Sequence, residues 1–364
     1  MTKKGIWVLV SVVVVLALLL GVFGCKEAPV TPTTTSPTTS TPTTTQTPSE
    51  VITLKWHNSF PKAALNLAEQ MWMDEVEEAS NGRIKFDRIF GGALGTLDQA
   101  PENIRVRAFD LGQISAVYNP GAYPRTSVSV LPFLTTNTLA QYVSTNELFN
   151  SDLTNQDFAT LNQKYLLNGM WAKLELMSKE PINNIADLGQ WKLRTHGGAA
   201  DAMTALGYTS YAIPWEEYAA AAERGVVDGG IQGTPADAND IGLGDVWKYW
   251  ERFTWYYFPM TLVINLDAWN EIPADLQTLI LAISETYNVE SDNIYHEQEL
   301  IADQALTAKG VQKVYWDSAE INKLKEQAGA PVWEKWVTDQ TAAGISNAQE
   351  ILDFYEARLQ YYSE

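Results

Sequence analysis

Side chains that usually carry out catalysis are scarce in this chain of 364 residues. It has three histidines and one cysteine, Cys25, so it cannot form an intrachain disulfide, and no cysteine or histidine motif has the spacing of a zinc site. Gly242 and Gly244 begin a dinucleotide-binding motif that the following residues do not complete. Because catalysis needs a nucleophile beside a base, or two carboxyl groups of unequal pKa, we expect neither enzymatic activity nor a cofactor.

Charge and metal-ligand patterns narrow the possible partners further. The segment from Asp237 to Gly242 resembles the start of a calcium loop, but Lys248 stands where such a loop needs a glutamate, so we expect no metal site. The formal charge of −19 argues against nucleic acid, because phosphate binding needs clustered positive charge. Four tryptophans lie at strand ends or loop entries, where an aromatic ring can line a ligand cleft: Trp56, Trp171, Trp215 and Trp255.

The first fifty residues differ in composition from the rest. Two lysines precede an apolar run over residues 6–23, and Gly24 and Cys25 follow it, which is typical of a secretory signal. A retained transmembrane helix is the alternative, since about 18 apolar residues approach the length that spans a membrane. The segment Val22–Cys25 resembles a bacterial lipobox. We therefore expect a lipoprotein signal peptide over 1–24, a lipidated Cys25, and an anchor in the membrane.

Residues 25–50 form a linker in this interpretation. From Thr31 to Ser49 every residue is Thr, Pro or Ser except Gln46, so the segment has no apolar side chains to bury. Regular prolines favour an extended conformation, which would hold the folded part away from the membrane.

Strand and helix patterns alternate in the folded part, which begins at Val51. The pattern predicts an α/β fold with a largely parallel sheet, and its recurrence after the middle of the chain predicts a second lobe. Expected strands cover 51–56, 83–90, 111–114, 191–195, 209–213, 226–231 and 262–265. Expected helices cover 63–79, 101–108, 199–206, 215–224, 274–309 and a region beyond 320.

A series of short motifs carries a family resemblance over nearly all of this part. In order, they occupy residues 54–61, 81–86, 92–95, 110–112, 131–134, 181–188, 192–194 (K-L-R), 205–207, 213–218 (I-P-W-E-E-Y) and 225–229 (G-V-V-D-G). Together they resemble the DctP-type solute-binding proteins of tripartite ATP-independent periplasmic (TRAP) transporters. The resemblance implies a two-lobed periplasmic-binding-protein-like fold with a ligand cleft between the lobes and long C-terminal helices. It places one lobe at 51–171 plus about 260–300, and the other at 172–259 plus about 301–364.

The same resemblance implies that Arg194 holds the carboxylate of the ligand. A guanidinium suits this role because it offers two parallel donors and stays charged when water is removed. A surface or interlobe ion pair is the alternative for Arg194. Trp215, Ser115 and Tyr257 are further expected pocket residues, and packing is the alternative for each of them.

Two departures from the family pattern concern the ligand. Gln232 is the nearest equivalent of an asparagine that many members carry, and Lys173, beside Trp171, stands where some members have a second arginine. Both departures weaken the expectation of a plain dicarboxylate or sialic acid. A pocket that contains Trp171, Trp215 and Tyr257 favours a larger, partly apolar or ring-containing acid.

The resemblance implies an extracytoplasmic receptor that passes a small organic acid to the membrane subunits of a TRAP permease. A receptor that feeds a signalling sensor is the alternative, and neighbouring genes for two membrane subunits would distinguish the two. A surface hydrolase of the same shape would need a nucleophile and a base in the cleft.

Overall fold

The computed structural model describes residues 51–364, without the side chains of Ala64, Met170, Trp171, Glu216 and Gln232. The chain divides into two units, Met1–Pro48 and Ser49–Glu364, and all that follows concerns the second. The expected signal peptide, the lipidated Cys25 and the linker lie outside the described residues. No helix within residues 51–364 is long and apolar enough to cross a membrane.

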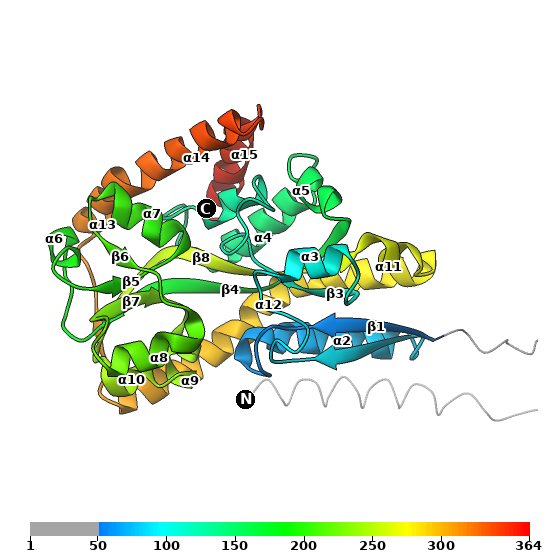
Figure 1. The fold of residues 1–364 in the computed structure, drawn as a ribbon, viewed down its shortest axis with the longest axis horizontal. Coiled ribbons are helices and arrows are strands. Elements are labelled where there is room, and N and C mark those ends of the chain that lie inside the picture. Colours follow the sequence, from blue (N-terminus) through cyan, green and yellow to red (C-terminus); the bar gives the residue numbers. More distant parts are fainter. Residues whose placement is uncertain (1–50) are drawn as a thin grey trace, which may run out of the picture. The chain divides into compact units, whose positions relative to one another are not determined.

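One mixed sheet connects all nine strands of the described residues (Figure 1). Eight of them lie in the order β2 (Ile84–Ile89), β1 (Ile52–His57), β3 (Leu111–Ile114), β8 (Tyr249–Asn265), β4 (Gln163–Ser178), β7 (Gly229–Gln232), β5 (Leu193–Arg194) and β6 (Ser210–Tyr211). The ninth, β9 (Gln312–Val314), pairs with β8. We call the part around β1, β2 and β3 the first lobe, and the part around β5, β6 and β7 the second lobe.

The sheet is parallel within each lobe and antiparallel where the lobes join. Strand β1 is parallel to β2 and β3, and β5 is parallel to β6 and β7. The long strands β4 and β8 are antiparallel to each other and to their outer neighbours, β7 and β3. The sequence predicted only the last four residues of β8. Fifteen of its 17 residues are buried, so it lacks the apolar–polar alternation that marks a half-exposed strand.

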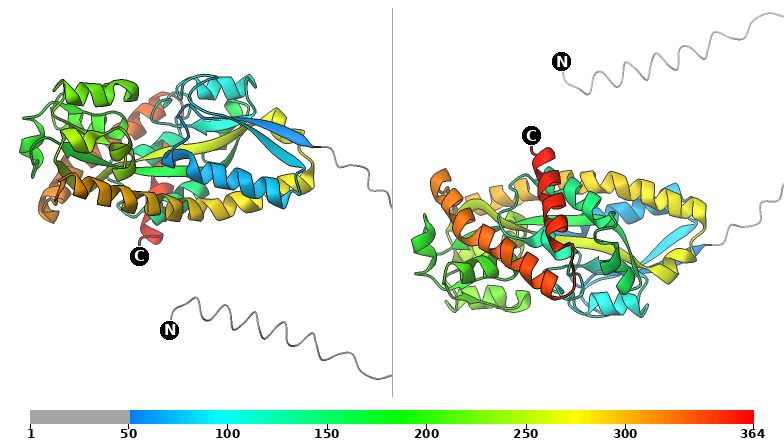
Figure 2. Two further views of the ribbon diagram at one scale, coloured as in Figure 1. Left: turned by 90° about the horizontal axis from the view of Figure 1, so that it is seen from below. Right: turned by 90° about the horizontal axis from the view of Figure 1, so that it is seen from above.

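Helices cover both faces of the sheet (Figures 1 and 2). They are α2 (Leu67–Ala79), α3 (Ala100–Arg105), α4 (Thr138–Phe149), α5 (Asn155–Thr160), α6 (Ile185–Leu188), α7 (Gly197–Ala205), α8 (Trp215–Glu223), α9 (Pro235–Asp240), α10 (Leu243–Val246), α11 (Leu266–Asn270), α12 (Ala274–Ala308), α13 (Ser318–Leu324), α14 (Ala330–Ala342) and α15 (Ala348–Tyr361). Short turns of other helix types cover Ala64–Asn66, Thr126–Val130 and Lys325–Gly329.

The helix α12 connects the two lobes along one face of the sheet. Its 35 residues pack against α2 and α4 at one end, against β4, and against α9 at the other end (Figure 2). The predicted helix over 274–309 is thereby confirmed. The last helix, α15, packs on α4, where the hydroxyl groups of Thr145 and Tyr355 are 2.8 Å apart.

Two of the tryptophans that the sequence singled out belong to the core. Trp56 is fully buried and its indole nitrogen donates to Glu69 Oε2 at 3.1 Å. Trp255 is also fully buried, and its ring lies 5.4 Å from that of Phe133. Each ring therefore stabilises a lobe by burying a large apolar surface, which is the usual role of a tryptophan.

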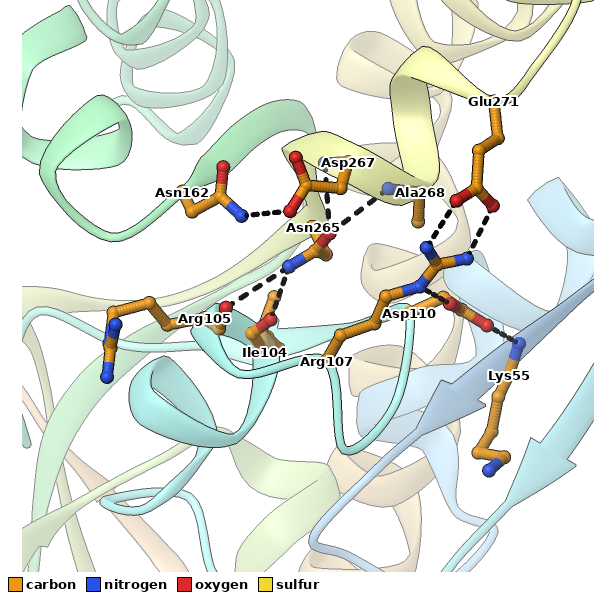
Figure 3. Close-up of polar contacts among 10 residues, drawn as sticks. All are labelled: Lys55, Ile104, Arg105, Arg107, Asp110, Asn162, Asn265, Asp267, Ala268 and Glu271. Atoms are coloured by element: carbon orange, nitrogen blue, oxygen red, sulfur yellow. Dashed lines mark hydrogen bonds and ion pairs between the residues drawn. The ribbon is translucent and has the colours of Figure 1, made fainter.

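A polar cluster fixes the end of β8 in the first lobe (Figure 3). Asn265 caps α11 because its Oδ1 accepts from the backbone nitrogens of Asp267 and Ala268, at 3.0 Å each. Its Nδ2 donates to the carbonyl oxygen of Ile104 at 2.8 Å, so one buried side chain joins β8 to the end of α3.

The same cluster holds the turn that leads into β3. Arg107 lies there at φ +58° and pairs with Asp110 at 2.9 Å and Glu271 at 2.6 Å (Figure 3). The other oxygen of Asp110 accepts from the backbone nitrogen of Lys55 in β1 at 2.7 Å. These contacts set β3 beside β1, and so determine where the segment after β3 enters the cleft described below.

Candidate ligand-binding site

Arg194 lies at the end of β5, in the middle of the second lobe. The strand has only two residues and is held on both sides by parallel neighbours, β6 and β7. The side chain of Arg194 is 1% exposed, and its Nε donates to the carbonyl oxygen of Ile213 at 3.0 Å. Backbone pairing and one side-chain hydrogen bond therefore fix the direction in which the guanidinium points.

Two aromatic rings support the guanidinium of Arg194. Its central carbon lies 4.4 Å from the ring centre of Tyr218 and 5.7 Å from that of Trp215. A Cβ at Gly230 would come within 2.1 Å of the Tyr218 hydroxyl oxygen, so this close approach requires glycine. No ion pair joins the guanidinium to any side chain that the structure describes, and its buried Nη1 has no hydrogen-bond partner among them. A buried cation with a free donor is costly unless an anion binds it.

The guanidinium faces a cavity of about 50 Å³ between the lobes. Residues from both long strands, from the first lobe and from the second lobe line it: Phe60, Leu65, Tyr118, Ala172, Leu174, Arg194, His196, Trp215, Gly233, Asp237, Phe258 and Met260. A wider space of about 440 Å³, partly open to solvent, shares five of these residues and continues past Ser59, Thr96, Leu97, Asp98, Ala212, Ile213 and Pro214. We call the two together the cleft.

Aromatic rings form one wall of the cleft. Phe258 stacks on His196 with ring centres 6.1 Å apart and meets the ring of Tyr118 edge to face at 5.8 Å. Tyr118 and His196 are themselves 6.0 Å apart. Such a wall suits a ligand that is flat or apolar beyond its charged group.

His196 is neutral in this setting. Burial, and to a lesser extent the positive charge of Arg194, lower the pKa of His196 to about 3. The hydroxyl of Tyr256 donates to the His196 carbonyl oxygen at 3.1 Å, and His196 Nδ1 lies 2.9 Å from the same hydroxyl. Because that hydroxyl has one proton, Nδ1 must donate to it, which leaves Nε2 as an acceptor. Arg194 is therefore the positive charge of the cavity wall.

Asp237 is the acidic residue of the cavity wall. Its Oδ2 accepts from the backbone nitrogen of Thr234 at 3.1 Å and lies 3.2 Å from the Thr234 hydroxyl and 3.4 Å from the Tyr295 hydroxyl. The two hydroxyls are 2.6 Å apart and have one proton each, so one donates to the other and only the second donates to Oδ2. Thr234 and Asp237 form a capping box at the start of α9. Burial raises the pKa of Asp237 to about 6. The sequence pattern that resembled a calcium loop is therefore a helix cap.

Of the site residues expected from the sequence, the structure brings Arg194 and Trp215 together in the cleft. Ser115 is fully buried just beyond β3, and it is not among the lining residues. Trp171 pairs with Pro259 and Gln232 with Glu175 in the sheet, and their side chains lie outside the described set.

Lys173 and Tyr257 are opposite each other in β4 and β8, on the face of the sheet away from the cleft. Their neighbours Ala172, Leu174 and Phe258 line the cavity, and successive residues of a strand point to opposite faces. Tyr257 is 3% exposed and belongs to the core that also contains Tyr355. Lys173 instead acts electrostatically on carboxyl groups of α12, which are those of Asp292 and Glu299.

Ten of the twelve residues that line the cavity were not expected from the sequence, among them Phe60, Tyr118, His196, Asp237 and Phe258. The sequence held a signal for one of these five. His196 directly follows the strand predicted over 191–195 and directly precedes two glycines, which is where the end of a parallel strand meets a helix. Tyr118 lies three residues beyond Ser115, and no pattern indicates how far the segment after β3 reaches.

Residues 58–340 match the model of the bacterial extracellular solute-binding protein family 7, which is named DctP. The chain belongs to this family. A curated relative is the monocarboxylate 2-oxoacid-binding periplasmic protein of Nostoc sp., which is 24% identical over 277 residues, or 72% of this chain and 76% of the relative.

Solved structures of TRAP solute-binding proteins share the family 7 fold seen here. One of them comes from a marine metagenome, is specific for aromatic acids and is bound to 3-hydroxybenzoate. It superposes with a TM-score of 0.78 at 21% sequence identity, and the match covers 87% of this chain and 100% of that protein. One from Rhodoferax ferrireducens, bound to benzoate, has a TM-score of 0.75 at 22% identity and covers 86% and 99%. At these identities the likeness establishes the two-lobed fold of this family 7 chain and leaves its ligand open.

Proposed function

We propose that this family 7 protein is the extracytoplasmic receptor of a TRAP transporter, and that it captures an organic acid in the cleft by means of Arg194. The observation that carries this proposal is the buried guanidinium, which has a free donor and no carboxylate partner among the side chains that the structure describes. A ligand carboxylate would supply the missing negative charge and acceptor. The cleft excludes much of the water that would otherwise weaken the pair.

The lining favours an acid that is flat and apolar beyond its carboxylate. Phe258, Tyr118, Phe60 and Trp215 surround the space next to Arg194, and Ala172 closes it from β4. A sugar acid would place hydroxyl groups against these surfaces, where few polar side chains could pair with them. The ligands of the compared proteins, a 2-oxoacid, 3-hydroxybenzoate and benzoate, agree with this choice.

Delivery to a membrane permease follows from the family rather than from any contact in the chain. In the proposal, the lipid on Cys25 keeps the receptor at the membrane, and the linker over 25–50 gives it reach. The closed receptor then presents its ligand to the membrane subunits, which take it up with an ion gradient.

The proposal is tested by measuring thermal unfolding of the full-length chain in detergent with a panel of probes. The panel contains benzoate, 3-hydroxybenzoate, phenylpyruvate, succinate, glucuronate and glucose. A ligand at about 100 times its Kd stabilises the protein by roughly 2.7 kcal/mol. That corresponds to a rise in Tm of roughly 4 °C for a folded body of this size. We expect aromatic monocarboxylates to raise Tm, and a rise with glucose but with none of the acids would refute the proposal.

A further inference from the structure

The cavity wall carries a negative charge as well as a positive one. Asp237 lines the same cavity as Arg194, but it comes from α9 rather than from β5. A carboxylate repels the anionic ligand that Arg194 attracts, so its presence needs an explanation. Capping of α9 explains only part of it, because the cap uses a single oxygen.

The hydrogen bonds that the Asp237 carboxylate makes to described residues all use one oxygen atom. Oδ2 accepts from the backbone nitrogen of Thr234 and from one of the two hydroxyls of Thr234 and Tyr295, and no described donor bonds to Oδ1. The residue keeps 9% of its surface exposed and is one of the residues that line the cavity. The carboxylate therefore offers Oδ1 as an acceptor toward the ligand space.

The position of this acceptor is fixed. A Cβ at residue 233 would come within 1.9 Å of Oδ2, so Gly233 lets the carboxylate lie directly against the backbone of its own turn. The Tyr295 hydroxyl, from α12, lies 3.4 Å from the same oxygen. Burial raises the pKa of Asp237 to about 6, so the group is mostly ionised at pH 7.5 and acts there as an acceptor.

We propose that Oδ1 of Asp237 accepts a hydrogen bond from a hydroxyl or amino group on the ligand, at the end remote from the carboxylate held by Arg194. The inference rests on the proposed function and narrows its ligand class to monocarboxylates that carry a distal hydrogen-bond donor. An acid without that donor leaves a buried acceptor unpaired. A dicarboxylate places a second negative charge against Asp237. A site with a buried polar group strongly rejects ligand analogues that lack the matching hydrogen-bonding group.

Matched acids test this inference in the wild-type chain. Calorimetry at pH 7.5, on the full-length protein in detergent, compares benzoate with 3- and 4-hydroxybenzoate, and phenylacetate with 3- and 4-hydroxyphenylacetate. We expect at least one hydroxylated acid to bind tenfold or more tightly than its parent. Isophthalate, which has a carboxylate in place of the hydroxyl, should bind at least tenfold more weakly than 3-hydroxybenzoate. Parent acids that bind as tightly as all hydroxylated ones would overturn the inference.

The variant Asp237→Asn tests the residue itself. The amide oxygen can take the place of Oδ2, where the backbone nitrogen of Thr234 and one hydroxyl require an acceptor, so the amide nitrogen replaces Oδ1 and donates into the cavity. The hydroxyl preference should fall at least fivefold, and isophthalate should bind at least tenfold more tightly than it binds the wild type.

Asp240→Asn is the matched control for Asp237→Asn. It removes an equal charge from the same helix at an exposed position outside the cavity wall. Its preference for hydroxylated acids over their parents, and for 3-hydroxybenzoate over isophthalate, should therefore stay within twofold of the wild-type values. If Asp237→Asn keeps the wild-type preferences, the inference is wrong while the proposed function stands. If the wild type binds none of these acids but its Tm rises with other organic acids, the inference is also wrong. If no acid of either panel binds, the proposed function fails as well.

Discussion

Replacing Arg194 with methionine should separate ligand binding from stability. Methionine keeps most of the side-chain volume and removes the charge, so the change leaves no large cavity. The guanidinium is 1% exposed and Nη1 has no partner, so in the ligand-free protein it is a buried cation that is only partly satisfied. In the bound protein the same group is expected to pair with the ligand.

The expected free-energy change is large for ligand binding and small for the unfolding of the ligand-free protein. Removing one partner of a buried charge pair costs about 2–5 kcal/mol, so binding should weaken roughly 30- to 4000-fold. Without ligand, the variant loses the bond from Nε to Ile213, worth about 1 kcal/mol, and the contact with the Tyr218 ring, worth about 1–2 kcal/mol. It also removes an unsatisfied buried donor that costs about 1–3 kcal/mol. The net change in unfolding free energy should be within about 2 kcal/mol of zero.

Calorimetry with the tightest acid of the panel and thermal unfolding without ligand measure the two quantities. The Tm of the ligand-free variant should lie within about 5 °C of the wild type, and the rise with ligand should disappear. Arg194→Lys keeps the charge but loses the two-pronged geometry, so it should recover only part of the affinity. Binding by Arg194→Met within threefold of the wild type would refute the reasoning. A fall in Tm above 10 °C with unchanged affinity would mean that the arginine is structural.

Three further predictions concern other parts of the chain. Burial raises the pKa of Glu69 to about 8 from an ordinary value of 4.5, so the folded protein holds an extra proton between these values and loses stability as pH rises through them. In denaturant unfolding, the unfolding free energy of Glu69→Gln should rise by about 3 kcal/mol relative to that of the wild type between pH 5 and pH 8. A difference between the two proteins that does not change with pH would contradict the burial argument. Gly230→Ala should displace Tyr218 from beneath Arg194 and weaken acid binding at least tenfold, whereas Gly121→Ala, whose Cβ meets no atom within 4 Å, should bind normally in the same calorimetric assay. Cys25→Ala should abolish membrane association in cell fractionation, and a variant that still partitions with membranes after signal removal would disprove the lipid anchor.

The sequence predicted where single helices and strands begin and end better than it predicted which strands pair. The strand over 111–114 and the helices over 215–224 and 274–309 lie within a residue of the observed elements, because capping residues and apolar spacing mark their ends. The prediction of a largely parallel sheet does not hold at the centre of the sheet. Strands β4 and β8 are antiparallel, and neither shows the pattern of a strand with one exposed face, because helices cover both faces.

The missing information on strand pairing also explains which site residues could be predicted from the sequence. Arg194 and Trp215 come with family motifs, so their place in the cleft could be predicted. Tyr257 and Phe258 are both aromatic and both buried, and only the register of β8 against β4 determines which one faces the cleft. A shift by one residue reverses that choice, and nothing in the local sequence fixes the register.

The continuous strands β4 and β8 also determine how the molecule can be divided. Strand β8 pairs with β3 of the first lobe, β4 pairs with β7 of the second lobe, and β4 and β8 pair with each other. The strands of the first lobe are therefore separated along the chain from β8, their neighbour in the sheet, by all the strands of the second lobe. A fragment that ends before residue 249 would leave edges of β3 and β4 unpaired, and exposed edges invite aggregation. A newly made chain cannot complete the sheet around Arg194 until more than two thirds of it has emerged, so binding activity and folding of the whole body should appear together.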